Sequence, residues 1–129
     1  MRISASGMRA QTARMRMVAE NMANANSVAD SPEAEPYRRK IVSFRNVVDR
    51  LTDTPRVEVQ RISRDASPFG RRYDPGHPGA DEQGFVRTTN VQSMMEMMDL
   101  RSAQRSYEAN LSVIQISRTM VQGVLDILR

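Results

Sequence analysis

The only histidine of the chain, His77, lies in a turn-rich stretch that also contains Asp74 and Asp81. One imidazole and two carboxylates are ligand types that a zinc ion accepts, so this spacing could hold a metal. The alternative, which we favour, is a rigid turn fixed by Pro75 and Pro78, in which the imidazole packs or hydrogen-bonds. No Ser/His/Asp arrangement, glycine-rich phosphate loop or spaced carboxylate pair has supporting motif context. The sequence therefore predicts no catalytic residue, no metal ligand and no cofactor.

A tight basic cluster is the second place where side chains could bind something charged. It consists of Arg38, Arg39 and Lys40, which would alternate between the two faces of a strand. DNA binding is one possible use of these charges. The other use is contact with carboxylates of neighbouring protein subunits, and the basic residues are spread along the chain as this second use requires. The candidate carboxylates are Asp30, Glu33, Glu35, Glu96 and Asp99.

The composition is that of one domain of 129 residues with a net charge of +4. The absence of cysteine excludes disulfides, thiolate metal sites and cysteine nucleophiles. No apolar run approaches the length of about 18 residues that a membrane span needs. Arginines interrupt the first 17 residues, so we expect no cleaved signal peptide of the Sec type. Ten methionines and only 5% aromatic residues suit helix contacts that differ from one neighbour to the next.

The first part of the chain is predicted to be a helix over residues 3–26. Methionines recur there every seven residues, at Met1, Met8, Met15 and Met22. This interval is typical of a helix that meets other helices along a seam, although packing on the protein's own core fits the spacing as well. The helix ends in small and amide side chains, which could let backbones approach and could hydrogen-bond the free carbonyls of the last turn.

The middle of the chain holds all six prolines and four of the six glycines. Two β-branched segments, residues 37–44 and 56–62, are predicted to be short strands, and a third strand is expected at Gly84 to Arg87. We therefore divide the chain into an N-terminal helix (1–28), a small β-rich and loop-rich region (29–89) and a C-terminal helix (90–129).

The C-terminal helix is predicted over about residues 91–128. Asn90 or Ser93 can cap it, and Ser93 with Glu96 fits a capping box. One row of side chains forms a predicted assembly seam: Leu100, Tyr107, Asn110, Leu111, Ile114, Val121 and Leu128. A second apolar row lies on another side of the helix: Val113, Ile116, Met120 and Ile127.

These rows make the C-terminal helix apolar over more than half of its circumference, so it must be buried on several sides. One partner helix of about 24 residues and short strands cannot cover that area, which indicates that other chains do so. The predicted fold class is α+β, with long terminal helices that pair in a coiled-coil-like bundle around a small β-rich middle region.

The N-terminal segment resembles the signature of the bacterial flagellar axial proteins, which include rod, hook and hook-associated proteins. The matching residues are Ser6, Gly7, Ala10, Arg14, Ala19, Asn21, Ala23 and Asn24. Three further stretches, PYRRKIVSF, YDPGHPGADEQGFV and NVQSMMEMMDLRSAQRSYEANLSVI, narrow the resemblance to the rod proteins. The turn motif within them consists of Tyr73, Asp74, Pro75, His77, Pro78, Asp81 and Gly84.

The resemblance implies a structural subunit of the flagellar basal-body rod, the helical drive shaft that transmits torque. Such subunits are exported unfolded by the flagellar type III apparatus and assemble in the periplasm with copies of themselves and other rod proteins. The resemblance implies neither nucleic-acid binding nor a membrane span. Subunit contacts that do not close into a ring generate a helical tube of this kind.

Two other functions remain open from the residues alone. A free-standing coiled-coil scaffold or adaptor would form a small closed oligomer, whereas a rod subunit would assemble without closure. A basic DNA-binding protein would show an affinity that falls steeply with salt.

Overall fold

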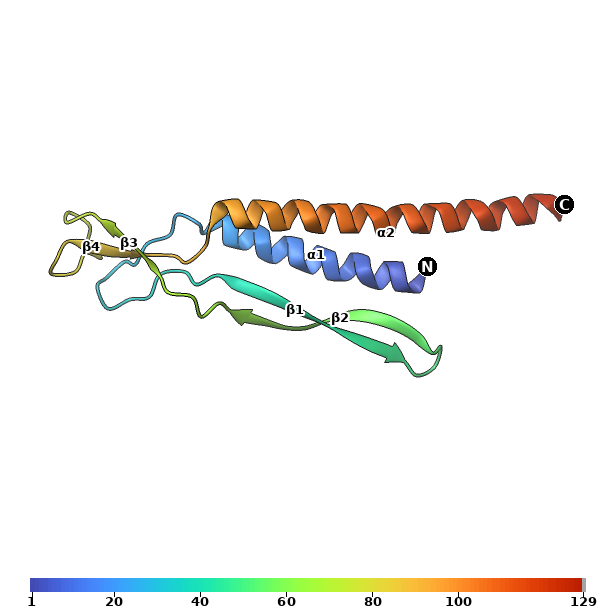
Figure 1. The fold of residues 1–129 in the computed structure, drawn as a ribbon, viewed down its shortest axis with the longest axis horizontal. Coiled ribbons are helices and arrows are strands. Elements are labelled where there is room, and N and C mark those ends of the chain that lie inside the picture. Colours follow the sequence, from blue (N-terminus) through green and yellow to red (C-terminus); the bar gives the residue numbers. More distant parts are fainter. Residues whose placement is uncertain (129) are drawn as a thin grey trace.

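The computed structural model, which describes residues 1–128, contains one helix at each end of the chain and two small antiparallel sheets between them in sequence (Figure 1). The elements in chain order are α1 (Arg2–Ala23), β1 (Lys40–Asp49), β2 (Thr54–Arg64), β3 (Gly70–Tyr73), β4 (Phe85–Thr88) and α2 (Ser93–Ile127). The predicted α+β class, with helical termini and a β-rich middle, is confirmed. Neither helix of the described part carries an apolar stretch long enough to cross a bilayer.

The two helices pack side by side in opposite directions, which confirms the predicted pairing of the termini (Figure 1). The 35 residues of α2 make it about 52 Å long, whereas the 22 residues of α1 span about 33 Å. The C-terminal part of α2 therefore extends past the first residue of α1.

Small side chains line the contact between the helices. Ala10 of α1 and Ala103 of α2 are buried. A Cβ atom at Gly7 would lie only 3.0 Å from Nδ2 of Asn110. The buried positions of α1 are Ser4, Ser6, Ala10, Val18 and Asn21, of which Ser6 and Ala10 also lie against β2. Of the predicted methionine seam, Met8, Met15 and Met22 are half-buried, and Met8 lies beside Tyr107 and Ile114 of α2, so the contact of this seam with further helices stays a prediction.

The hairpin of β1 and β2 is longer than the two predicted strands. Its ladder runs from the pair Lys40 and Arg64 to the pair Asp49 and Thr54, with one irregularity next to Ser43. The ladder begins only at residue 40 because the backbone N–H of the preceding Arg39 donates to Oδ1 of Asn90 (2.7 Å) instead.

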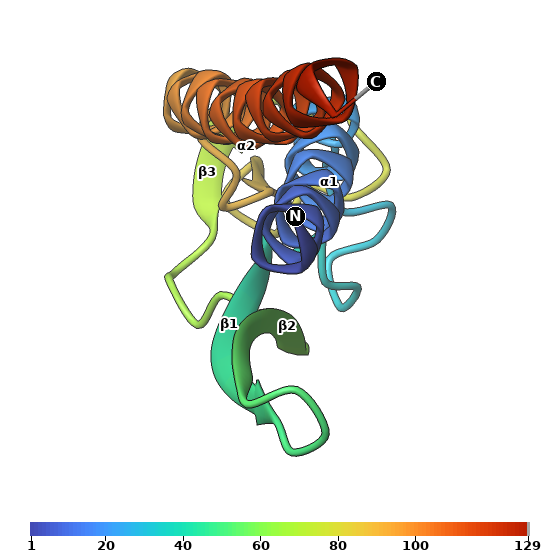
Figure 2. The same cartoon turned by 90° about the vertical axis from the view of Figure 1, so that its right-hand side faces the viewer.

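This hairpin projects from the helix pair on the side of α1 (Figure 2). Val57 N of β2 donates a hydrogen bond to Oγ of Ser6 (3.3 Å) and so fastens the hairpin to the first half of α1.

The second sheet, β3 with β4, lies beyond the paired ends of the helices (Figure 1). The expected third strand is present one residue later, as β4, and its partner β3 lies in the stretch that the sequence predicts to form turns. Gly84, in the turn before β4, has a φ of 82°, a conformation that favours glycine. A Cβ atom at Gly79 would lie 2.0 Å from the carbonyl oxygen of Ala29, so this glycine lets the turn pack against the loop after α1.

The predicted capping box at the start of α2 is wrong. Gln92 precedes the helix and no side chain caps its first turn. The Glu96 side chain turns away from the helix end and binds Asn21 and Arg39, because these partners satisfy it in a buried position.

Replacing Ala103 by leucine is expected to destabilise the protein. Ala103 is fully buried on the face of α2 that carries the α1 contacts of Glu96, Asp99 and Asn110, so a larger side chain forces the helices apart. The free energy of unfolding, measured by urea denaturation, should fall by about 1–3 kcal/mol. The matched change at exposed Ser102 should alter it by less than about 0.5 kcal/mol, and equal effects would contradict this packing.

Candidate assembly interface

Large apolar side chains remain exposed along most of α2. The second apolar row is open to solvent throughout: Val113 is 50% exposed, Ile116 60%, Met120 67% and Ile127 84%. Four exposed methionines crowd the first turns: Met94, Met95, Met97 and Met98. The prediction that this chain cannot cover the apolar circumference of its own C-terminal helix is confirmed.

The predicted seam divides into a covered half and an open half. Leu100, Tyr107, Asn110 and Ile114 are partly buried. Leu111, Val121 and Leu128 are exposed, the last two because α1 does not reach that far along α2. The covered half therefore pairs the two helices of one chain, and the open half joins the second row as a surface.

The total accessible surface is 9305 Å². A compact monomer of 14.6 kDa exposes about 6,900 Å² by the usual scaling. The excess of about 2,400 Å² is large beside the roughly 800 Å² that each partner buries in a standard interface. This shape and its apolar side chains fit a subunit with several neighbours.

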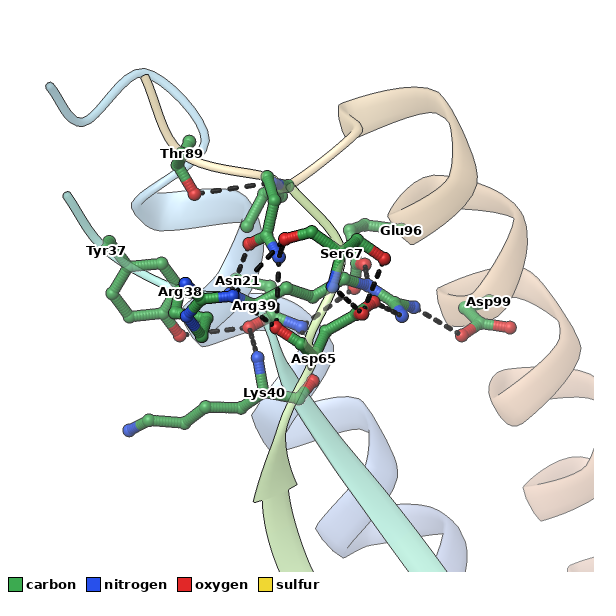
Figure 3. A network of polar contacts seen from close by, with 12 residues as sticks. Asn21, Tyr37, Arg38, Arg39, Lys40, Asp65, Ser67, Thr89, Glu96 and Asp99 are labelled. Carbon is green, nitrogen blue, oxygen red and sulfur yellow. Dashed lines mark hydrogen bonds and ion pairs between the residues drawn. The ribbon is translucent and has the colours of Figure 1, made fainter. Parts of the chain in front are cut away.

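A buried polar network holds the two helices and the hairpin in one arrangement (Figure 3). Its centre is Glu96, whose side chain is 0% exposed. The Glu96 carboxylate accepts from Nδ2 of Asn21 on α1 (3.1 Å) and from Nε of Arg39, the residue before β1. One carboxylate of α2 thus links this helix to α1 and to the start of the hairpin.

Asn21 uses both ends of its amide at this junction. Nδ2 also donates to the carbonyl oxygen of Lys40 (2.9 Å). Oδ1 accepts from Lys40 N (2.9 Å) and from the hydroxyl of Tyr37 (2.9 Å). Asn21 therefore pairs with β1 much as a neighbouring strand would, which gives this asparagine of the N-terminal motif a structural role.

Arg39 joins Glu96 to two further carboxylates, Asp65 at 3.2 Å and Asp99 at 3.7 Å. Partial burial of the guanidinium opposes its charge, but the hydrogen bonds with Glu96 and Asp65 outweigh burial and raise the pKa of Arg39. Asp99 also accepts from Arg14 of α1 (2.8 Å), so this arginine of the motif links α1 to α2.

Lys40 and Tyr37 extend the network to the end of α1. Lys40 forms an ion pair with Glu20, and the hydrogen bond to this carboxylate raises the pKa of Lys40. Burial raises the pKa of Tyr37, with a further contribution from the charge of Glu20. Tyr37 lies in the recognised PYRRK stretch, but its hydrogen bond to Asn21 needed the tertiary structure to be seen.

Arg38 binds the segment that follows β2. Its Nη1 donates to the carbonyls of Asp65 (2.9 Å) and Ser67 (3.2 Å), and its guanidinium lies 4.1 Å from the ring centre of Phe69. Asn90 Nδ2 donates to the same two carbonyls (3.2 and 3.1 Å).

The basic cluster thus has partners within its own chain, and its contact with neighbouring subunits stays a prediction. The expected alternation of these three residues between the two faces of a strand is not observed, because Arg38 and Arg39 precede β1. Of the candidate carboxylates, Glu96 and Asp99 belong to the internal network.

The motif residues of α1 fall into two groups. Ser6, Gly7, Ala10, Arg14, Asn21 and Asn24 make contacts within the chain, Asn24 by donating to the Glu20 carbonyl at the helix end (2.8 Å). Ala19 and Ala23 are exposed on the opposite side. The structure gives these two alanines no internal role.

The turn around His77 has the local hydrogen bonds of a rigid turn. His77 Nδ1 accepts from Gly79 N (2.9 Å), and Asp81 Oδ1 accepts from Gln83 N and Phe85 N (both 2.9 Å). The bond from Phe85 N is the main cause that lowers the pKa of Asp81. Within residues 1–128 no three potential ligands gather as a metal site. Tyr73, at the end of β3, packs edge-on against Phe85.

The geometry describes a subunit built for assembly, with an internal polar junction and an open apolar helix. The sequence family described as "Flagellar basal body rod FlgEFG protein C-terminal" matches residues 82–127. The flagellar basal-body rod protein FlgC of Agrobacterium fabrum is 44% identical over 99% of this chain and 92% of its own length. The FlgC proteins of Aquifex aeolicus (40% over 96% of this chain and 91% of that protein) and Bacillus subtilis (34% over 97% and 93%) are similar.

These similarities place the chain in the class of flagellar basal-body rod proteins. Within that class, it belongs to the FlgC family. It is a structural protein of the flagellar basal body and not an enzyme, and it assembles with other rod components.

Changing Asn21 to aspartate is expected to open the junction. The amide donor that faces Glu96 and the Lys40 carbonyl becomes an acceptor, so buried groups lose partners and two carboxylates meet. Thermal or urea unfolding should show a loss of at least about 1–3 kcal/mol. The same change at exposed Asn26 should cost less than about 0.5 kcal/mol. Similar losses at both positions would contradict the role of Asn21.

Acid is expected to weaken the segment that Asp65 organises. Hydrogen bonds from Ser67 Oγ (2.6 Å) and Ser67 N (2.9 Å), followed by the contact with Arg39, lower the pKa of Asp65 from its ordinary 3.8. Its stabilising contribution is therefore fully present above pH 3.8 and is lost as pH falls through the lower pKa of the folded state. Between neutral pH and pH about 3, the free energy of unfolding should fall less in the Asp65→Asn variant than in the wild type. Parallel pH profiles would exclude this contribution.

Proposed function

We propose that the chain is built into the wall of a helical rod through the open apolar surface of α2, with copies of itself and other rod proteins as neighbours. The single observation that carries this proposal is that α2 leaves its second apolar row exposed after α1 and the hairpin have packed. The assembled rod then acts as the drive shaft that transmits torque.

The open surface has the character of an interface and not of an ordinary solvated helix. Exposed apolar residues continue from Leu111 to Leu128 on both predicted rows. A continuous patch of this kind marks a site of protein contact, since it costs free energy in water. Removing such surface contributes roughly 25 cal/mol per Å², so a helix layer shared by several subunits would be strongly stabilised.

The shape of the subunit favours contacts that do not close into a ring. The open end of α2 extends beyond α1 on one side, whereas the β3–β4 sheet extends beyond the helices on the other (Figure 1). Different surfaces at the two ends of one subunit give heterologous contacts, which propagate as a helix and not as a closed pair. Ala19 and Ala23, the motif residues without an internal role, would let a neighbouring helix approach α1 closely.

We also propose that the chain is exported unfolded by the flagellar type III apparatus and assembles in the periplasmic section of the basal body. The small core supports an easily unfolded chain, because its buried apolar side chains are few and mostly small: Ala10, Val18, Ala29, Val86, Val91 and Ala103. Retention of the N-terminal residues is part of the proposal, since α1 begins at Arg2 and pairs with α2.

The division into residues 1–28, 29–89 and 90–129 is retained as a proposal about assembly units, with Arg129 outside the described residues. The hairpin belongs to the second unit and contacts the first, because Lys40 binds Asn21 and Glu20. The basic cluster does not favour DNA binding, since Arg39 and Lys40 already meet carboxylates.

Introducing charge on the open surface should prevent assembly without unfolding the subunit. In the Ile116→Glu/Met120→Glu variant, two exposed apolar side chains become charged, so helix content and thermal unfolding should stay close to those of the wild type. Swimming in soft agar, in cells whose only copy of this rod protein is the variant, should be lost because a buried unpaired charge is costly at a subunit contact.

The matched control changes Gln115 and Thr119 to glutamate on the polar side of the same turns. This variant should still swim. Normal swimming of the Ile116→Glu/Met120→Glu variant would contradict an assembly role for this surface.

A further inference from the structure

Three arginines form a row along α1 that the polar junction does not use. Arg2, Arg9 and Arg16 are spaced by seven residues and all three are exposed. Seven residues bring an α-helix back to nearly the same direction about 10.5 Å further along, so the row is about 21 Å long. We call these residues the arginine row.

The arginine row has no ion pair within the described residues. The contrast with Arg14 on the same helix is informative, because that side chain faces α2 and binds Asp99 at 2.8 Å. The chain therefore pairs the arginine that faces inward and leaves the row on the flank of α1 without an ion pair, although Arg2 lies near enough to Asp49 for its charge to help lower the pKa of that carboxyl.

A matching negative charge lies on the loop that follows α1. Asp30, Glu33 and Glu35 are exposed there and none of them forms an ion pair within residues 1–128. We call residues 30–35 the acidic loop. Asp30 and Glu35 border a hollow of about 460 Å³ on this part of the surface.

The acidic loop is held in place without neutralising its charge. Nη2 of Arg87, on β4, donates to the carbonyl oxygens of Ala34 (2.6 Å) and Pro32 (3.4 Å). The guanidinium thereby fixes the backbone of the loop, and the three carboxylates stay available. Carboxylates bind guanidinium groups particularly well, because the planar guanidinium can donate two parallel hydrogen bonds.

The two charged surfaces lie on different parts of the subunit. The arginine row begins at the N-terminus of α1, and the acidic loop follows the other end of this helix (Figure 1). Contact between the first arginine and the loop consequently requires two molecules.

From these observations we infer that the arginine row of one copy of this chain binds the acidic loop of a second copy. The inference rests on the proposed assembly function and names a contact separate from the apolar surface of α2. Three positive and three negative charges on one chain favour a second copy over an anionic lipid surface or nucleic acid, since either of these would leave the acidic loop unused and be repelled by it. The contact is heterologous, so it adds subunits in one direction without closing.

Reciprocal charge reversal tests the contact in cells. The full chain or a variant is supplied as the only copy of this rod protein in the bacterium that makes it. Swimming should be lost in Arg9→Glu/Arg16→Glu and also in Glu33→Arg/Glu35→Arg, because each change places like charges opposite one another. The variant that combines all four changes should swim again, because the charges are exchanged and the pairs are restored.

The control reverses two arginines of β2, Arg61 and Arg64, which are also exposed and without ion pairs among the described residues. Arg61→Glu/Arg64→Glu should swim like the wild type. Circular dichroism and thermal unfolding of each purified variant should match the wild type, since the substituted side chains lie on the surface.

A cross-link provides a readout that does not depend on charge reversal. The chain contains no cysteine, so after mild oxidation with copper phenanthroline a disulfide that joins an Arg9→Cys copy to a Glu35→Cys copy, identified by a different tag on each copy, can form only between the two introduced thiols. Both variants are expressed together, and isolated basal bodies should contain the linked dimer. Copies carrying Arg61→Cys with Glu35→Cys should give none.

The outcomes separate this inference from the proposed function. Failure of the wild-type chain to restore swimming would contradict the proposed function itself. Normal swimming of either reversed pair, continued loss in the combined variant, or absence of the disulfide would overturn only the contact between the arginine row and the acidic loop. Purified wild type is also mixed with phosphatidylglycerol vesicles and with duplex DNA. Tight binding to either that Arg9→Glu/Arg16→Glu abolishes, with no recovery in the combined variant, would assign the row to that ligand instead.

Discussion

The buried carboxylate of Glu96 is the constraint on which the arrangement of this subunit depends. It receives hydrogen bonds from the end of α1 and from the residue before β1, while it belongs to α2. A carboxylate in a dry site is stable only when its partners stay in place, so any separation of the three elements leaves charge unpaired. The junction consequently specifies how the hairpin sits against the helices, a task that the small apolar core alone is poorly suited to perform.

The rest of the structure follows from the contrast between this junction and the open end of α2. At the junction, Asn21, Arg39 and Lys40 find every partner within the chain. Further along α2 the apolar residues outnumber the surfaces that α1 and the hairpin can offer, and they remain exposed. The subunit is therefore rigidly organised at one place and incomplete at another, as a component of a larger assembly must be.

Membership of the FlgC family accounts for the apolar surface of α2 that this chain leaves exposed. Three unlike surfaces of this chain are proposed to face neighbours in the rod: the apolar face of α2, the arginine row and the acidic loop. The apolar face provides most of the area that can be buried, whereas opposite charges favour one orientation of the neighbour over others. The apolar face would thus supply most of the stability of the assembly, and the charged surfaces would supply its specificity.

The sequence by itself determined the helical ends, the α+β class and the excess of apolar surface, because these depend on the periodicity of residue types along one segment. It also located the motif residues, but could not say that Asn21 pairs with Lys40 or that Gly7 makes room for Asn110. Only the tertiary structure decided that Arg39 and Lys40 bind carboxylates of their own chain, that Glu96 is buried instead of capping α2, and that β3 pairs with β4. The physical reason is the same in each case: these contacts join residues far apart in the chain, and which partner a charged or polar group takes depends on the distances that folding creates.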